Sequence, residues 1–324
     1  MNEPVLLKVR DLRVGFGTPY GTVRRAVRGL NLTVEEGGSL AILGESGSGK
    51  SVTGRALMGL VDPPGHVAGS IEFGGRELVG ASEAELKDVR GTGIAMVFQD
   101  SLDSLNPVYS VGSQLSEIFR ARLKYSREVA RKEAVRLMDQ VGIADAGARL
   151  GDYPHQFSGG MRQRICIAMA IALKPRLLIA DEPTTALDVT IQAGILRLLR
   201  ELQHQTGMSL IFVTHDLSVA RVVARRVAVM YAGKVVEEGP IDQIYAKPAH
   251  PYTRALLASE PDAVSDWTQL RPIPGSPLDS EVVLPGCSFH PRCPMAKDTC
   301  RSEEPLLRPI GESQVSRCHF AELV

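Results

Sequence analysis

The sequence has no net charge, few aromatic residues and no hydrophobic run long enough to span a membrane. Lys and Arg together number 37, as do Asp and Glu, whereas duplex-binding proteins usually carry a basic excess. The charge-free apolar run at 165–173 is about half the length that a transmembrane helix needs. The amino-terminal residues mix both charges early, unlike a secretory signal. We therefore expect a cytosolic protein with no nucleic-acid partner, which needs another subunit for any membrane role.

Cysteine is also scarce, and its distribution is uneven. Cys166 stands alone in the apolar run and is predicted to be a buried hydrophobic residue. In a reducing compartment, a cluster of four further cysteines indicates a metal site rather than disulfides, although plain thiols would fit the same pattern. Four thiolates can hold zinc or an iron–sulfur cluster. The cluster consists of Cys287, Cys293, Cys300 and Cys318, with His290 and His319 as alternative zinc ligands.

Short apolar strands alternate with helical stripes along most of the chain. Predicted strands occupy residues 40–43, 177–180, 209–213 and 227–231. Apolar side chains recur at helical spacing over 130–141 and 191–202. This alternation is typical of an α/β fold with a mostly parallel sheet and covering helices. From about residue 240 prolines become frequent, so a loop-rich carboxyl-terminal extension is expected.

Residues 44–51, GESGSGKS, fit the phosphate-loop pattern G-x-x-x-x-G-K-[ST]. Glycines let successive backbone N–H groups face phosphate oxygens, and the following helix directs its positive end at the anion. Lys50 is predicted to reach the β- and γ-phosphates of ATP, and the Ser51 hydroxyl to ligate Mg²⁺. The predicted ATP-binding residues here are Gly44, Ser46, Gly47, Ser48, Gly49, Lys50, Ser51 and Val52.

The apolar strand at 177–180 ends in Asp181 and Glu182. A strand end beside a phosphate loop is where acidic side chains can serve the metal and the attacking water. Asp181 is predicted to hold Mg²⁺. Glu182 is predicted to act as the general base, a role worth roughly 10²–10⁴ in rate.

A second potential anion site is formed by Ser158, Gly159, Gly160 and Met161, which precede a helical stretch. A hydroxyl, exposed N–H groups and a helix amino terminus are combined there. Because the phosphate loop already binds the phosphates, this segment needs a separate explanation. It is either a simple helix cap or a contact to the nucleotide held by another subunit.

These segments, in this order, resemble an ABC (ATP-binding cassette) ATPase. The generic signature Leu-Ser-Gly-Gly-Gln occurs with Phe157 and Met161 at its first and last places, and Asp188 resembles the acid of the D-loop. The resemblance implies a P-loop NTPase core with an antiparallel β subdomain and a helical subdomain. It also implies a dimer that sandwiches two ATP molecules, each between one phosphate loop and the Ser158 segment of the other subunit.

The same resemblance implies roles for residues outside these motifs. Gln99, after an apolar strand, would ligate Mg²⁺ and sense the γ-phosphate. His215 would contact the γ-phosphate and orient Glu182, which makes Gln99, Glu182 and His215 the predicted catalytic group. Phe16 would stack on adenine, with Tyr20 as the alternative.

Longer stretches are similar to the ATP-binding subunits of oligopeptide and dipeptide importers, whose close relatives import nickel. They are DEPTTALDVTIQ at 181–192, HPYT at 250–253 and the segment 285–300. The resemblance implies an ATPase that energises peptide import, with nickel or another solute as the alternative and a soluble, non-transport ATPase as a more distant one. Some members bind a [4Fe–4S] cluster in this tail, which favours an iron–sulfur cluster on the four cysteines, with zinc as the alternative.

The implied partners are a second ATPase subunit, identical or paralogous, and two transmembrane permeases. The permeases would contact residues of about 100–117, and an extracytoplasmic solute-binding protein would take part indirectly. The chain would then lie peripherally at the cytoplasmic face of the membrane. We expect a nucleotide-binding domain at 1–240, with its helical subdomain at about 100–163, and the extension at 241–324.

Overall fold

The structure is a computed structural model that describes residues 4–18, 21–99, 104–185, 187–259, 272–279 and 281–324. The chain divides into two compact units. Unit 1 comprises Met1–Ala81 and Ile211–Val324, and unit 2 comprises Ser82–Leu210. The phosphate loop and the carboxyl-terminal extension therefore belong to the same unit.

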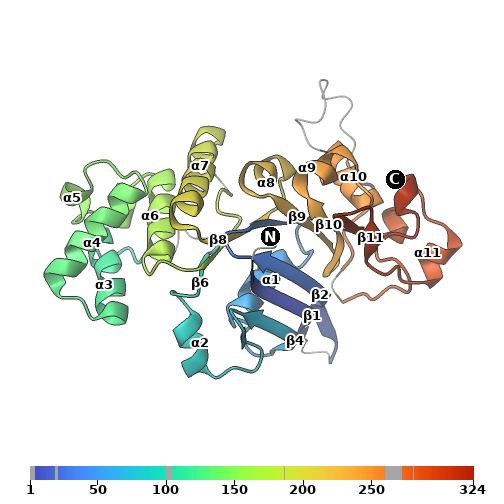
Figure 1. Cartoon of the computed structure of the whole chain (residues 1–324), viewed down its shortest axis with the longest axis horizontal. Coiled ribbons are helices and arrows are strands. Elements are labelled where there is room, and N and C mark those ends of the chain that lie inside the picture. The colour runs from blue at the N-terminus through green and yellow to red at the C-terminus, as the bar shows by residue number, and fades with distance from the viewer. Residues whose placement is uncertain (1–3, 19–20, 100–103, 186, 260–271, 280) are drawn as a thin grey trace. The chain divides into compact units, whose positions relative to one another are not determined.

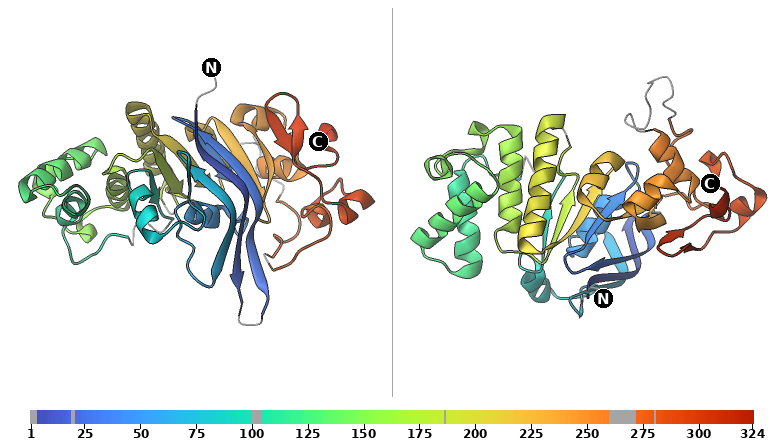
Figure 2. Two further views of the ribbon diagram at one scale, coloured as in Figure 1. Left: turned by 60° about the horizontal axis from the view of Figure 1, so that its bottom comes forward. Right: turned by 45° about the horizontal axis from the view of Figure 1, so that its top comes forward.

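Unit 1 contains a four-stranded antiparallel sheet in the order β2-β1-β4-β5. The strands are β1 (Val5–Gly17), β2 (Val23–Glu35), β4 (Gly65–Phe73) and β5 (Arg76–Glu77). The first two form the long hairpin in the left view of Figure 2. Gly74 and Gly75, both with positive φ, make the tight turn between β4 and β5, as expected for residues without a Cβ.

A second set of strands in unit 1 follows the order β11-β12-β10-β9-β3-β8. They are β3 (Ser39–Leu43), β8 (Ser209–Thr214, of which the last four residues belong to unit 1), β9 (Arg226–Tyr231), β10 (Lys234–Pro240), β11 (Arg308–Ile310) and β12 (Gln314–Ser316). Strands β3 and β9 are parallel, whereas β10, β12 and β11 pair antiparallel. All five residues of β3 are buried, as expected for a strand covered on both faces.

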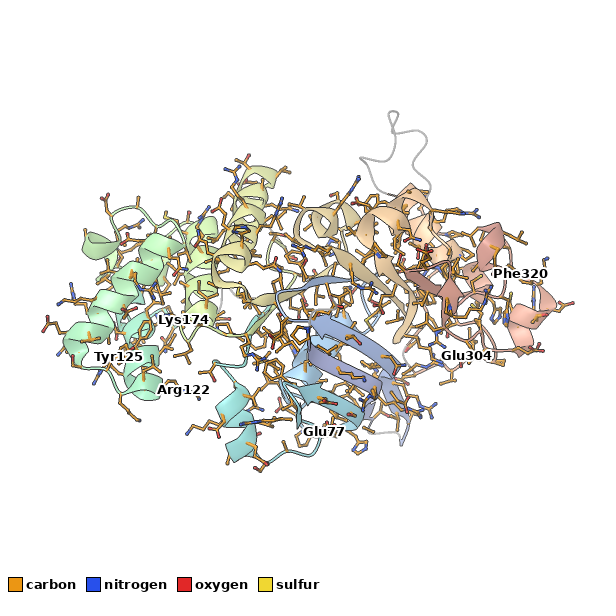
Figure 3. The ribbon with its side chains drawn as sticks, viewed as in Figure 1. Glu77, Arg122, Tyr125, Lys174, Glu304 and Phe320 are labelled. Atoms are coloured by element: carbon orange, nitrogen blue, oxygen red, sulfur yellow. The ribbon has the colours of Figure 1, made fainter. Side chains whose placement is uncertain are left out.

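The carboxyl-terminal extension adds helices as well as strands to unit 1. Its helices are α9 (Ile241–Ala246), α10 (Pro251–Ala258) and α11 (Asp298–Ser302), and its strands β12 and β11 continue from β10 (Figure 1). Tyr252 and Phe289 are buried in the same core cluster as Tyr231 of β9. An ion pair joins Lys234 of β10 to Glu304, which is labelled in Figure 3. The extension is thus packed onto the core by apolar and ionic contacts.

The remaining helices of unit 1 are α1 (Lys50–Leu57) and α8 (Leu217–Val223), which follow β3 and β8 respectively. Both begin directly beyond the carboxyl end of a strand. In folds of this type ligands bind at that end of the strands. The predicted phosphate loop and His215 occupy these two connections.

Unit 2 is mostly helical. It contains α2 (Glu83–Val89), β6 (Ile94–Val97), α3 (Val111–Leu123), α4 (Arg127–Gln140), α5 (Ala146–Arg149), α6 (Gly159–Ile171), β7 (Leu177–Asp181) and α7 (Val189–Thr206). Strands β6 and β7 are parallel. The predicted stripe on α4 is confirmed, because Ala130, Ala134, Leu137 and Met138 are all buried. Within the described residues, no helix is long and apolar enough to cross a membrane.

Candidate nucleotide-binding site

The phosphate loop of unit 1 joins the buried strand β3 to helix α1. Two of its glycines leave no room for a side chain. A Cβ on Gly44 would lie 2.2 Å from the Met230 carbonyl oxygen, and one on Gly49 would lie 2.3 Å from the Ala26 carbonyl oxygen. Gly49 also has φ +101°, where other residues are strained. The sequence therefore forms a backbone cradle of the kind that phosphates occupy.

Lys50 is the first residue of α1 and is 5% exposed. Its Nζ donates hydrogen bonds to the carbonyl oxygens of Gly44 at 2.7 Å and Glu45 at 3.0 Å. The ammonium group is therefore held against the loop rather than extended into solvent. The Ser48 side chain is also buried, and its Oγ has no hydrogen-bond partner among the described residues. A polar atom in that condition is suited to a bound ligand.

Phe16, the predicted adenine-stacking residue, lies near the end of β1 opposite Gly65 of β4. Its ring is half-buried, and its Cε1 lies 2.8 Å from the position of a Cβ on Gly65. The ring therefore packs closely against the backbone of Gly65. Tyr20, the alternative, lies outside the described residues. Stacking on adenine stays a prediction.

His215 is exposed and follows β8. The next residue, Asp216, caps α8 by accepting a hydrogen bond from the backbone N–H of Val219 at 3.0 Å. The cap places His215 in the short connection between strand and helix. Its contact with a γ-phosphate stays a prediction.

In unit 2, the structure brings two predicted catalytic residues together. Gln99 Nε2 donates a hydrogen bond to Glu182 Oε2 at 3.3 Å, although the two are 83 positions apart. Thr185 Oγ1 donates to the same oxygen at 3.0 Å. Glu182 has φ +44°, a left-handed conformation that costs energy for a residue with a Cβ and recurs at functional sites. Asp181, the last residue of β7, is 2% exposed.

The second predicted anion site lies at the start of α6, where Ser158 is the N-cap. Its Oγ accepts a hydrogen bond from the backbone N–H of Met161 at 3.4 Å. Ser158 thus acts as a helix cap within its own chain. Its contact with the nucleotide of another subunit stays a prediction. Asp188 caps α7 in the same way, by accepting from the N–H of Ile191 at 3.0 Å.

Both departures from the generic signature contact one arginine, Arg149 of α5. Its guanidinium lies 4.1 Å from the centre of the Phe157 ring, and its Nη1 lies 3.2 Å from Sδ of Met161. A cation over an aromatic face is stabilising, and leucine at 157 would not provide it. The sequence gave no sign of this contact, because Arg149 lies in a separate helix, eight positions before Phe157.

The four clustered cysteines line one small cavity in the extension, together with His250, His290 and His319. Burial raises the pKa of the Cys287 thiol to about 11, and it also raises the pKa values of Cys293 and Cys318. Within the described residues, no group of three or more His, Cys, Asp or Glu has the geometry to hold a metal ion. Four cysteines around one cavity are the right ligand type for a metal or cluster held by thiolates. Their positions in this structure, however, do not have the geometry of a formed metal site.

Two residues of the extension that motif analysis missed contact the phosphate loop directly. Arg292 forms a bidentate ion pair with Glu45, and the Tyr252 hydroxyl accepts a hydrogen bond from the Glu45 N–H. The hydrogen bonds to Glu45 raise the pKa of the Arg292 guanidinium above its ordinary value. Both residues occur in stretches that resembled importer subunits, but the sequence pattern alone gave them no role.

The fold and the phosphate loop define a P-loop nucleotide-binding protein. A profile of the family described as "ABC transporter" matches residues 27–185, and one described as "Oligopeptide/dipeptide transporter, C-terminal region" matches residues 236–300. The chain belongs to the ABC transporter family, as an ATP-hydrolysing subunit.

Curated relatives and solved structures support this assignment. The chain is 48% identical over 316 residues to the dipeptide transport ATP-binding protein DppD of Escherichia coli (strain K12), covering 97% of this chain and 96% of that protein. It is 50% identical to the oligopeptide transport ATP-binding protein OppD of Bacillus subtilis (strain 168), covering 95% and 87%. The dimeric post-hydrolysis structure of the ATP-binding cassette MJ0796, bound to ADP and Pi, matches with a TM-score of 0.65 at 29% identity, covering 73% of this chain and 99% of that one.

Proposed function

We propose that this chain is the ATP-hydrolysing subunit of a membrane importer of dipeptides or oligopeptides. The observation that carries the proposal is similarity along nearly the whole chain, extension included, to ATP-binding proteins of dipeptide and oligopeptide transport. The extension matters most, because its profile is described as belonging to oligopeptide and dipeptide transporters. We propose further that the chain lies at the cytoplasmic face of the membrane, bound to two permeases.

The roles proposed for the site rest on the resemblance to ABC ATPases and, for the phosphate loop, also on its local geometry. The loop from Gly44 to Ser51, held rigid by its close backbone contacts, would bind the phosphates with Lys50 as counter-charge. Ser51, Asp181 and Gln99 would hold Mg²⁺, which supplies neutralisation of charge on the phosphate oxygens. Phe16 would stack on adenine, and His215 would contact the γ-phosphate.

Glu182 is proposed as the general base. Two hydrogen bonds to its Oε2, from Gln99 and Thr185, fix the orientation of the carboxylate, which leaves it poised to accept a proton from water. Glu182 also has a positive φ, and backbone strain of this kind recurs at functional sites.

We also propose a dimer in which the segment Ser158–Met161 of one subunit completes the nucleotide site of the other. The support is the dimeric MJ0796 structure and the helix amino terminus at Ser158. The Asp188 side chain, at the start of α7, would lie in the same interface. The second subunit is either this chain or a paralogue.

For the extension, we propose that Cys287, Cys293, Cys300 and Cys318 bind an iron–sulfur cluster, with zinc as the alternative. The support is that all four line one cavity. Such a group would cross-link the loops of the extension. Anaerobic purification followed by iron, sulfide and zinc analysis tests this: a visible chromophore with iron supports the cluster, stoichiometric zinc without colour supports the alternative, and neither metal overturns both.

The decisive experiment uses the subunit together with its permeases in proteoliposomes. Wild-type complex should couple ATP hydrolysis to uptake of a labelled dipeptide or oligopeptide. Glu182→Gln should bind ATP but lose turnover by roughly 10²-fold or more. Uptake of nickel and not of peptide would refute the substrate class, and normal turnover by Glu182→Gln would refute the choice of base.

A further inference from the structure

The carboxyl-terminal extension binds the phosphate loop at Glu45, the second residue of the loop. Arg292 donates two hydrogen bonds to its carboxylate, from Nη1 to Oε2 at 2.7 Å and from Nη2 to Oε1 at 3.0 Å. Tyr252 Oη accepts a third from the Glu45 backbone N–H at 2.9 Å. The Arg292 side chain is 5% exposed and the Glu45 side chain 23% exposed, so water and salt screen this ion pair less than they screen a surface pair.

Arg292 is itself held in place by the extension and the core. Its Nε donates to the Pro274 carbonyl oxygen at 2.8 Å. Its guanidinium lies 5.8 Å and 5.9 Å from the ring centres of Tyr231 and Phe289. All three guanidinium nitrogens donate hydrogen bonds, so this planar group has little freedom and fixes the position of the carboxylate to which it is bonded.

Glu45 passes this constraint to the residues that would face phosphate. Its carbonyl oxygen accepts from Lys50 Nζ at 3.0 Å and from the Ser48 N–H at 3.2 Å. The backbone of Glu45 is therefore held on both sides of its Cα, at its N–H by Tyr252 and at its carbonyl oxygen by Lys50. Arg292 also neutralises an acidic side chain in the phosphate loop, where an unpaired negative charge would repel ATP.

We propose that Arg292 is a positioning residue for ATP binding, and that the folded carboxyl-terminal extension sets the phosphate loop in its binding conformation. The inference deepens the proposed function, because it concerns the same nucleotide site. It makes the extension part of the ATPase machinery rather than an appendage. Since Arg292 directly precedes Cys293 of the cysteine cavity, the order of that cavity and the geometry of the loop are linked through one residue.

The experiment measures equilibrium binding of ATP to the full-length chain, and KM and kcat for ATP in the complex with its permeases. Arg292→Gln should weaken ATP binding by about tenfold or more. The variant loses the charged hydrogen bonds to the Glu45 carboxylate, and it leaves the negative charge of that carboxylate free to repel the phosphates of ATP. The effect should fall on KM more than on kcat, as expected for lost ground-state binding. The matched control is Arg308→Gln, which breaks a bidentate pair with Glu322 in the same extension and should leave ATP affinity unchanged.

A second substitution separates positioning from simple loss of structure. Glu45→Gln added to Arg292→Gln removes the unpaired charge, so the double variant should bind ATP more tightly than Arg292→Gln alone. If the arginine merely stabilised the extension, the double variant would be no better than the single one, and that result would overturn the proposal. Wild-type affinity in Arg292→Gln would overturn it as well.

Should Arg292→Gln fail to fold, Tyr252→Phe provides an independent test, because it keeps the buried ring and removes only the acceptor for the Glu45 N–H. It should weaken ATP binding severalfold, and unchanged affinity in this variant would count against the proposal. Failure of the proposed function gives a different result. Wild-type protein that bound no ATP would refute both the proposed function and the role of Arg292, whereas normal binding by the wild type and by the variants would refute only the role of Arg292.

Discussion

The two glycines at 47 and 49 allow a sharp test of whether the phosphate loop is set by close backbone contact. Both have positive φ, +79° and +101°, so alanine at either position pays a conformational cost of about 1–2 kcal/mol. Only Gly49 is also crowded: its Cβ would lie 2.3 Å from the Ala26 carbonyl oxygen, whereas a Cβ on Gly47 would meet nothing within 4 Å.

The magnitude follows from that difference. A contact of 2.3 Å must open to more than 3.0 Å, which requires the loop or strand β2 to move. Forced overpacking of this kind costs about 1–3 kcal/mol. Gly49→Ala should therefore destabilise the chain by about 1–3 kcal/mol more than Gly47→Ala, since the φ costs largely cancel between the two variants.

The assay is urea unfolding of the nucleotide-free chain, followed by a probe in unit 1, with the two variants compared under one buffer. Equal losses of unfolding free energy would show that the Ala26 contact is not tight, and the cradle described above would then be wrong. Binding of ATP, measured on the same samples, should be lost in Gly49→Ala because the displaced loop no longer presents its N–H groups.

Two further results are expected. Asp188→Ala removes the side-chain cap of α7 and should cost about 1 kcal/mol, as should Ser126→Ala at the start of α4; only Asp188→Ala should also lower ATPase activity, and equal activity in both would contradict an interfacial role for Asp188. Burial raises the pKa of the Cys166 thiol to about 12, so the folded chain should leave Cys166 unmodified by an alkylating reagent at pH 8. Because the thiolate is the reactive form, labelling should increase only as the pH approaches that value, and rapid labelling at pH 8 would show that Cys166 is not buried as the structure has it.

The sequence was most informative where the chemistry is contiguous. Three features each lie within a few consecutive residues: the phosphate loop, the strand ending in Asp181 and Glu182, and the Ser158 cap. Local preferences for glycine in turns, apolar residues in buried strands and serine at helix starts are enough to predict them. Strands β3, β7, β8 and β9 and helices α4 and α7 occur where the apolar pattern predicted them. A strand covered on both faces is a continuous apolar run, whereas a helix with one buried face repeats its apolar residues at helical spacing. The burial of Cys166 was also predicted correctly, from its place in a charge-free apolar run.

Only the tertiary structure decided which distant residues meet. Gln99 and Glu182 are hydrogen-bonded although they are 83 positions apart, and Arg292 forms an ion pair with Glu45, which is 247 positions away. Nothing local specifies such pairs, because they depend on how strands and loops pack after they form. The cysteine spacing predicted a cluster, but the fold had to bring the four side chains to one cavity. The sequence therefore determined the chemistry that this protein carries, and the packing of the extension against the core decided what holds that chemistry in place.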